Sequence, residues 1–449
     1  MGITVGKFGG TSLATRSQIE KCLAIVRSDP SRKYVVVSAP GSRFKGDIKV
    51  TDLLIKAAGE FPATGRSAAV DEVIERFREI LPENAALVAG LQEELQQRLK
   101  DTAAVNYLES IKAFGEYACA LTVTGILKHQ GHDAVCLDPR DFGLRITGVG
   151  NHAWPDPGCY RKAGRLLRAK AGSALAIIPG FYGYDKAGRL QTLPRGGSDT
   201  SGAAVARAVN AAVYENWTDE DGLKRADPRI VPHAATISAM TYDEARELAY
   251  MGFKLQDACF APIKGTGIVL AVRNTNNPGH PGTMIMDVRE VDPDERIVGV
   301  AREDGFITIG MRKMYIDREV GFGRKMLSVP EKLHLPYEHT PDGVDSAALV
   351  LARKHLHTDA ALNQVVDRLK KVCRPDTMMV RDMSLVSVAG AGMKNHFDVH
   401  ARAFAALARE KIAIRMVDDG ADDLSFFIGV DQERSSDAVR AIYAEFYAG

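Results

Sequence analysis

The sequence lacks several features that would assign it to a familiar class of protein. It contains no C-x-x-C pair, and its six cysteines are scattered over 449 residues, so we expect reduced thiols rather than a disulfide framework or a zinc cluster. It has no apolar run long enough to span a bilayer and no basic-then-apolar leader, which makes the cytoplasm the expected location. Its 58 basic and 57 acidic residues nearly balance, so we expect neither nucleic acid nor a membrane as a partner.

Two common phosphate-binding motifs are also absent. Neither G-x-x-x-x-G-K-[ST] nor G-x-G-x-x-G occurs in the chain. The eleven histidines show no ligand spacing on a common helix face, so none is assigned to catalysis or to a metal. Any anionic ligand must therefore be bound by a local group of residues of another kind.

Residues 1–290 alternate short β-branched runs with longer amphipathic segments, beginning with a strand at 3–8 and a helix at 17–27. This alternation predicts a parallel α/β sheet. Residues 70–131 have leucine and alanine at helical spacing almost throughout, which predicts helices inserted between strands. Further strands are predicted at 34–38, 134–137, 174–179, 212–217 and 268–273.

Beyond residue 290 the pattern changes to two similar βαββα cassettes, which indicate a tandem repeat. The first is predicted as strand 306–315, helix 323–333, strands 337–340 and 347–352, and helix 360–372. The second is predicted as strand 385–389, helix 399–411, strands 413–417 and 424–430, and helix 436–446. Small units of this type usually pair edge to edge, which favours a dimer.

The first candidate site is Lys7-Phe8-Gly9-Gly10-Thr11-Ser12, between a predicted strand and a predicted helix. Two successive glycines let backbone N–H groups approach a phosphate, and Lys7 can lie along its anionic oxygens. A plain tight turn would use the same glycines. The stretch alone therefore leaves both interpretations open.

Two further stretches suit oxyanions and a nucleotide. Pro194 to Ser201 places Arg195, two glycines and Asp199 at the start of a predicted helix, where arginine can form a planar fork to a carboxylate or phosphate. Asp199 is either a helix N-cap or a carboxylate that orients cations around a transferring phosphate. The acidic turn from Thr218 to Gly222, followed by Asp227-Pro228-Arg229, is either a ribose-binding loop or a solvated surface turn.

In combination and in order, these stretches resemble the aspartate kinase family, as do Arg273-Asn274-Thr275 and Pro281-Gly282-Thr283. The resemblance covers essentially the whole chain. It implies the amino acid kinase fold, a parallel sheet between helices, for residues 1–290, and ACT-type regulatory domains at 299–375 and 380–449. Because the chain ends after the second cassette, it resembles the monofunctional form without an attached dehydrogenase.

The resemblance also implies a reaction. Members of the family use ATP and Mg²⁺ to phosphorylate the β-carboxylate of L-aspartate, the first step towards lysine, threonine and methionine. A carboxylate is already ionised at neutral pH, so the reaction needs positioning and charge neutralisation but no general base. Feedback inhibition by lysine or threonine at the ACT domains, and a homo-oligomer of at least two subunits, are implied as well.

Roles for individual residues follow from the same resemblance. Lys7, Asp199 and Lys254 would act on the transferring phosphate. The nucleotide would be bound by Lys7, Gly9, Gly10, Ser12, Thr218, Asp219, Asp227, Arg229 and Lys254. Aspartate would be held by Ser38, Thr51, Glu116, Arg195 and Ser198, where Glu116 fits because an ammonium group needs a carboxylate partner.

The chain departs from the family pattern at three places. Lys224 replaces a tyrosine beside the nucleotide base, Leu255-Gln256-Asp257-Ala258 replaces a His-Pro pair, and Gly343 to Ser346 replaces a Ser-Glu pair that contacts an inhibitor. Two alternatives therefore stand beside an aspartate kinase. One is a kinase of another acidic amino acid such as acetylglutamate, and the other is a catalytically silent subunit that only binds an effector.

Overall fold

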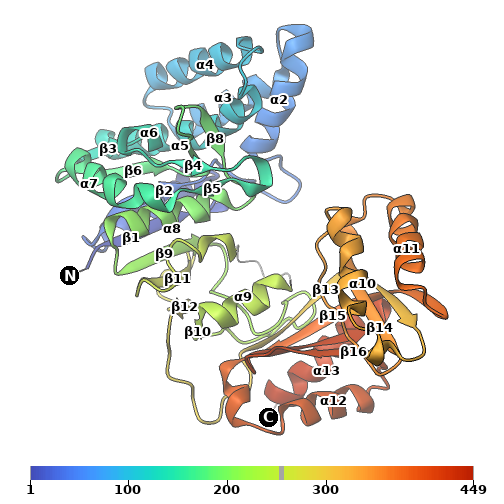
Figure 1. Ribbon diagram of the computed structural model, residues 1–449. Helices are drawn as coiled ribbons and strands as arrows, with labels where there is room; N and C mark the ends of the chain where they lie inside the picture. Colours follow the sequence, from blue (N-terminus) through green and yellow to red (C-terminus); the bar gives the residue numbers. More distant parts are fainter. Residues whose placement is uncertain (1, 252–256, 448–449) are drawn as a thin grey trace. The chain divides into compact units, whose positions relative to one another are not determined.

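The computed structural model describes residues 2–251 and 257–447 and divides the chain into two compact units (Figure 1). The first unit comprises Met1–Leu223, Ser238–Tyr242 and Leu255–Arg289, and the second comprises Lys224–Ile237, Asp243–Lys254 and Glu290–Gly449. The chain therefore passes between the units several times. No helix in the described part of the chain is long and apolar enough to cross a membrane.

The first unit is built on an eight-stranded sheet with the order β10-β12-β11-β9-β1-β2-β6-β3. All neighbours are parallel except β11 and β12, which confirms the predicted parallel α/β fold. The strands are β1 (Thr4–Phe8), β2 (Arg32–Val37), β3 (Ala134–Cys136), β6 (Leu175–Pro179), β9 (Val213–Thr218), β10 (Ala239–Thr241), β11 (Val269–Asn274) and β12 (Thr283–Met286). Two short hairpins, β4 (Ile146–Thr147) with β5 (Trp154–Pro155) and β7 (Tyr182–Tyr184) with β8 (Leu190–Thr192), complete its strands.

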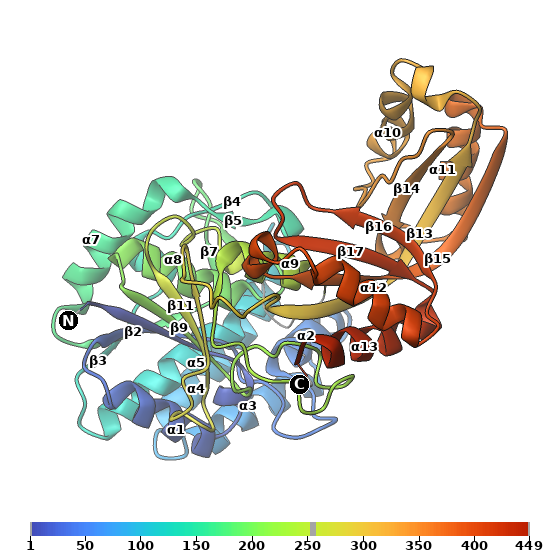
Figure 2. The same ribbon diagram turned by 90° about the horizontal axis from the view of Figure 1, so that it is seen from below.

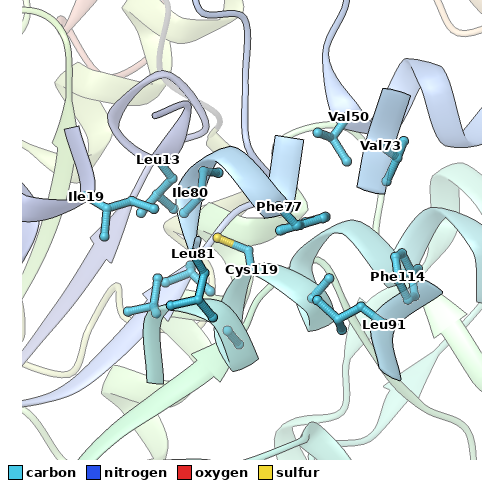
Figure 3. Packing of buried hydrophobic residues seen from close by; sticks show 14 of the residues in the cluster. Leu13, Ile19, Val50, Val73, Phe77, Ile80, Leu81, Leu91, Phe114 and Cys119 are labelled. Atoms are coloured by element: carbon cyan, nitrogen blue, oxygen red, sulfur yellow. The ribbon is translucent and has the colours of Figure 1, made fainter. Parts of the chain in front are cut away.

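Successive strand residues point to opposite faces of this sheet, and apolar side chains lie on both faces. Helices cover both faces and bury these side chains. Phe8 and Trp217 belong to an apolar cluster to which α1 to α5 contribute and part of which is shown in Figure 3. Tyr214 is three residues before Trp217 on β9, so its side chain points to the opposite face of the sheet. There it packs against Gly202 of α8. The helices are α1 (Arg16–Arg27), α2 (Val50–Thr64), α3 (Ala68–Ile80), α4 (Ala85–Lys100), α5 (Tyr107–His129), α6 (Pro139–Phe142), α7 (Tyr160–Ala171) and α8 (Gly197–Val209).

The second unit contains a five-stranded antiparallel sheet with the order β14-β13-β15-β17-β16. Its strands are β13 (Gly299–Arg312), β14 (Ser346–Ala352), β15 (Thr377–Ala389), β16 (Ile414–Asp419) and β17 (Ser425–Val430). Its helices are α9 (Tyr242–Tyr250), which begins in the first unit, α10 (Phe322–Lys332), α11 (Asp359–Cys373), α12 (Val399–Arg409) and α13 (Ser435–Tyr447). One apolar core lies between the sheet and the helices α10 and α11, and another lies between the sheet and the helices α12 and α13. Figure 2 shows these four helices beside the sheet.

One predicted strand of the first cassette is wrong. Residues 337–340 form no strand, and His339 makes only an isolated bridge to Val350. Pro336 and Pro341 flank the segment and cannot donate backbone hydrogen bonds, so a regular ladder is interrupted on both sides. The strand β15 runs without a break through residues 377–389, across the start of the second predicted domain at residue 380. The boundaries of the two predicted ACT-type domains stay a prediction.

Candidate functional site

The predicted phosphate turn after β1 and the predicted nucleotide turn at Thr218 and Asp219 lie at one edge of the first sheet. β1, β2, β9 and β11 are mutually parallel neighbours, so their carboxyl ends meet at the same edge, where ligands of α/β proteins usually bind. Backbone hydrogen bonds connect the turns that follow them. The N–H of Gly9 donates to the carbonyl of Trp217 at 3.0 Å, and the N–H of Thr275 donates to that of Thr218 at 2.8 Å.

Lys7 and Asp199 form an ion pair although 191 residues of chain separate them. Lys7 lies on β1 with its side chain towards α8, and Asp199 lies in the first turn of α8, where the helix dipole favours negative charge. Nζ of Lys7 is 2.5 Å from Oδ1 of Asp199, and their side chains are 9% and 15% exposed. A cation and an anion are thus held together at a helix N-terminus, an arrangement suited to a phosphate.

The glycine turn after β1 is packed tightly against the loop after β2. A Cβ at Gly10 would lie 2.9 Å from the carbonyl oxygen of Ala39, and the N–H of Gly41 donates to the carbonyl of Gly10 at 2.8 Å. Ser12 is buried, and its hydroxyl lies 2.8 Å from the hydroxyl of Thr275. The turn therefore depends on glycine at position 10 for its close approach to a neighbouring loop.

Glu116 is a buried carboxylate beside the same centre. It lies on α5, is 5% exposed, and its Oε2 has no hydrogen-bond partner among the described residues. Burial raises the pKa of Glu116 to about 8, against the opposing effects of the Ala39 N–H, the charge of Lys7 and the hydroxyl of Ser198. A buried carboxyl group with one oxygen free of hydrogen bonds can bind a cationic group of a ligand.

The remaining residues predicted to contact aspartate differ in exposure. Ser198 is buried in the first turn of α8, and Arg195 is exposed just before that helix. Ser38 follows β2 and Thr51 is the second residue of α2, and both are half-buried. The structure thus places Ser198 beside Glu116, whereas the roles of the other three residues stay predictions.

The predicted nucleotide residues fall in different parts of the structure. Thr218 and Asp219 follow β9 in the first unit, where the hydroxyl of Thr218 donates to Asp219 at 3.1 Å. Asp227 and Arg229 belong to the second unit and form an ion pair at 2.6 Å, which lowers the pKa of the Asp227 carboxyl. Lys254 lies outside the described residues.

The segment that carries Asp227 is anchored in the second unit. Ala226, Ile230 and Ala234 are part of the apolar core under α12 and α13. In the same segment, Nζ of Lys224 donates to the hydroxyl of Thr236 at 2.7 Å. A stretch that resembles a nucleotide motif in sequence therefore also contributes to the packing of the second unit.

Sequence reasoning missed a charged cluster inside the first unit. Glu215 in the middle of β9 is 4% exposed and contacts both Arg32 and Arg273. The available signal was a glutamate within the otherwise largely apolar run 213–217. Within the described residues no group of three or more His, Cys, Asp or Glu side chains is arranged to hold a metal ion. All six cysteines are free, and five of them are buried.

Comparison with known proteins gives consistent results over nearly the whole chain. Residues 2–274 match the amino acid kinase family, and residues 386–446 match the ACT domain. The chain is 36% identical to aspartokinase 3 of Bacillus subtilis over 454 residues, which cover 99% of each protein.

Two solved enzymes share the architecture. The aspartate kinase of Clostridium acetobutylicum is 33% identical, with a TM-score of 0.83 over 99% of this chain and all of that one. Aspartokinase III of Escherichia coli in complex with aspartate and ADP is 25% identical, with a TM-score of 0.80 over 99% of both chains. The same enzyme in complex with lysine and aspartate gives a TM-score of 0.76.

Proposed function

Because the chain belongs to the aspartokinases of the amino acid kinase family and is an aspartate kinase, we propose that Lys7, Asp199 and Glu116 form the centre at which ATP phosphorylates L-aspartate. The observation that carries the assignment is the ion pair of Lys7 and Asp199 at the N-terminus of α8, beside the buried Glu116. An oxygen of the substrate β-carboxylate attacks the γ-phosphorus, the new O–P bond forms as the bond to ADP breaks, and ADP leaves with the electron pair. No proton moves in this step.

Each group has a distinct task in the proposed centre. The ammonium group of Lys7 neutralises charge on the transferring phosphoryl group, and Asp199 holds that ammonium group in place. The carboxylate of Glu116 accepts hydrogen bonds from the α-ammonium group of the substrate aspartate. Ser198 and Arg195 bind the carboxylates of the substrate. The turn from Gly9 to Ser12 binds phosphate oxygens through backbone N–H groups.

Mg²⁺ is part of the proposal and enters with the nucleotide. The residues present fit this ion, because Mg²⁺ in kinases is usually bound by substrate phosphates, water and one or two carboxylates rather than by a protein cage. Asp199 is the acidic side chain placed at the proposed phosphate position and would hold it. When bound, the ion supplies charge neutralisation at the phosphates.

A direct assay tests the substrate assignment. ADP release is measured with ATP, Mg²⁺ and one of L-aspartate, L-glutamate or N-acetyl-L-glutamate, and the acyl phosphate is trapped with hydroxylamine. Hydroxamate formation with aspartate alone is the expected result. Turnover with acetylglutamate instead would contradict the role of Glu116, because an acetylated substrate has no ammonium group.

A matched pair of variants assigns the effect to the site. Glu116→Gln is expected to raise the KM for aspartate while leaving the KM for ATP nearly unchanged. Glu109→Gln makes the same substitution on the same helix, outside the proposed centre, and is expected to behave as the wild type. Equal effects of the two substitutions would contradict the assignment, and a wild type without any turnover would favour a silent effector-binding subunit.

Regulation by an amino acid and assembly into at least a dimer belong to the proposal as well. Aspartokinase III of Escherichia coli has been solved with lysine, which supports lysine as an effector here, with threonine as the alternative. A cavity of about 590 Å³ in the second unit, lined in part by Asp342, Gly343 and Ser346, is large enough for an amino acid. The cytoplasmic location stays a prediction.

A further inference from the structure

Three polar groups converge on one buried carboxylate in the first unit, away from the ion pair of Lys7. Arg32 donates to both oxygens of Glu215, at 2.6 and 3.0 Å, and Arg273 donates to Oε1 at 3.2 Å. The indole N–H of Trp217 donates to Oε2 at 3.0 Å. The side chains of Arg32 and Glu215 are 8% and 6% exposed, so the cluster is largely shielded from water.

The cluster connects four neighbouring strands. Arg32 lies on β2, Glu215 and Trp217 on β9, and Arg273 on β11, while β1 runs between β2 and β9. The ring of Trp217 stacks on that of Phe8 in β1 with a centroid distance of 6.1 Å. The guanidinium groups of Arg273 and Arg32 lie 4.9 and 5.7 Å from the centre of the Trp217 ring, within cation–π distance.

The same residues carry the turns of the proposed nucleotide site. The carbonyl of Trp217 accepts the N–H of Gly9, and Arg273 precedes Thr275 by two residues. Thr275 in turn contacts Ser12 and the carbonyl of Thr218. A shift of Trp217 or Arg273 would therefore move the phosphate turn and the loop after β9 together.

Stability alone is a weak reason for such a cluster. A buried ion pair is often no more stabilising than apolar side chains of similar size, because removing charges from water is costly. What a charged and hydrogen-bonded group does provide is one defined geometry for the strands that carry it. Neither Glu215 nor Arg32 takes part in the phosphoryl transfer described above.

We propose that Glu215 is a positioning residue for the nucleotide, which acts by fixing Trp217 and Arg273 under the turns after β1, β9 and β11. The inference rests on the proposed nucleotide site. Glu215 touches neither substrate. Its loss displaces the turns that bind ATP and leaves the centre around Glu116, where aspartate binds, in place.

The test measures ADP binding as well as turnover. Glu215→Gln keeps the shape of the side chain but removes the counter-charge of the buried Arg32 and of the half-buried Arg273. The Kd for Mg-ADP, from calorimetry and from the fluorescence of Trp217 in a Trp154→Phe background, is expected to rise about tenfold, with the KM for aspartate nearly unchanged. Because ADP binding needs no turnover, this test remains valid if phosphoryl transfer to aspartate is not observed.

Two further variants separate positioning from loss of stability. Leu95→Ala opens a cavity beside α4, within the apolar cluster that α1 to α5 form and distant in sequence from the turns, and is expected to lower the Tm without weakening ADP binding. The double variant Glu215→Gln with Arg273→Met removes one of the two uncompensated charges, and is expected to recover part of the lost Tm but not ADP affinity. If Glu215→Gln does not fold, Arg273→Lys keeps the charge and loses the planar fork, and weaker ADP binding is again expected.

Three outcomes would overturn the proposal. The first is an unchanged Kd for Mg-ADP in Glu215→Gln, or in Arg273→Lys where that variant replaces it. The second is a loss of ADP affinity in Leu95→Ala equal to that in Glu215→Gln. The third is wild-type ADP affinity in the double variant, which would show that only the unpaired charge mattered.

Discussion

The protonation of Glu116 gives the sharpest prediction of pH dependence. Burial raises its pKa from 4.5 to about 8, so between these values the folded protein binds a proton that the unfolded chain has released. The stability contribution of such a group is fully present below about pH 4.5 and is lost as the pH rises through about 8. Over that whole range the pKa change corresponds to about 5 kcal/mol.

Glu116→Gln removes the titration while keeping the size of the side chain. Between pH 5.5 and 8.5, the free energy of unfolding of the variant should rise relative to that of the wild type by about 3 kcal/mol. For a unit of this size that corresponds to a Tm difference of about 5 °C. Thermal unfolding of both proteins, with Glu109→Gln as the control for charge, measures this difference.

Aspartate binding should release the same proton. The α-ammonium group of the substrate favours the charged form of Glu116, so at pH 7 close to one proton leaves per aspartate bound. Calorimetric titrations in two buffers with different ionisation enthalpies count the protons, and Glu116→Gln should release none. A wild type that releases no proton at pH 7, together with a Tm difference that does not change with pH, would refute the reasoning.

Three other predictions concern the proposed centre. Lys7→Met and Asp199→Asn should each lower kcat by about 10²–10³-fold, because both act on developing charge; unchanged turnover in either variant would remove that residue from the mechanism. Arg195→Ala should raise the KM for aspartate in steady-state assays, and a selective rise in the KM for ATP would show that it binds the other substrate. Gly10→Ala should weaken Mg-ADP binding about tenfold in calorimetry, since its Cβ would lie 2.9 Å from the oxygen of Ala39; wild-type affinity would show that the turn can adjust.

Much of the fold could be predicted because its signals are local. Strand and helix periodicity in residues 1–290 was sufficient for the parallel sheet, and the helices α3 to α5 lie where the pattern placed them. The prediction of a strand at 337–340 was wrong because it did not consider the prolines on either side of the segment. Glu215 was missed because a charged residue in a strand shows its partners only after distant strands are brought together.

The candidate site divides in the same way between local and long-range information. The order of glycines, hydroxyls and charges along the chain is enough to indicate phosphate-binding turns and the family, because turn chemistry depends on adjacent residues. The sequence does not contain the 2.5 Å contact between Lys7 and Asp199, the raised pKa of Glu116, or the attachment of residues 224–237 to the second unit. These depend on burial and on distances between remote segments, and only the folded chain determines both.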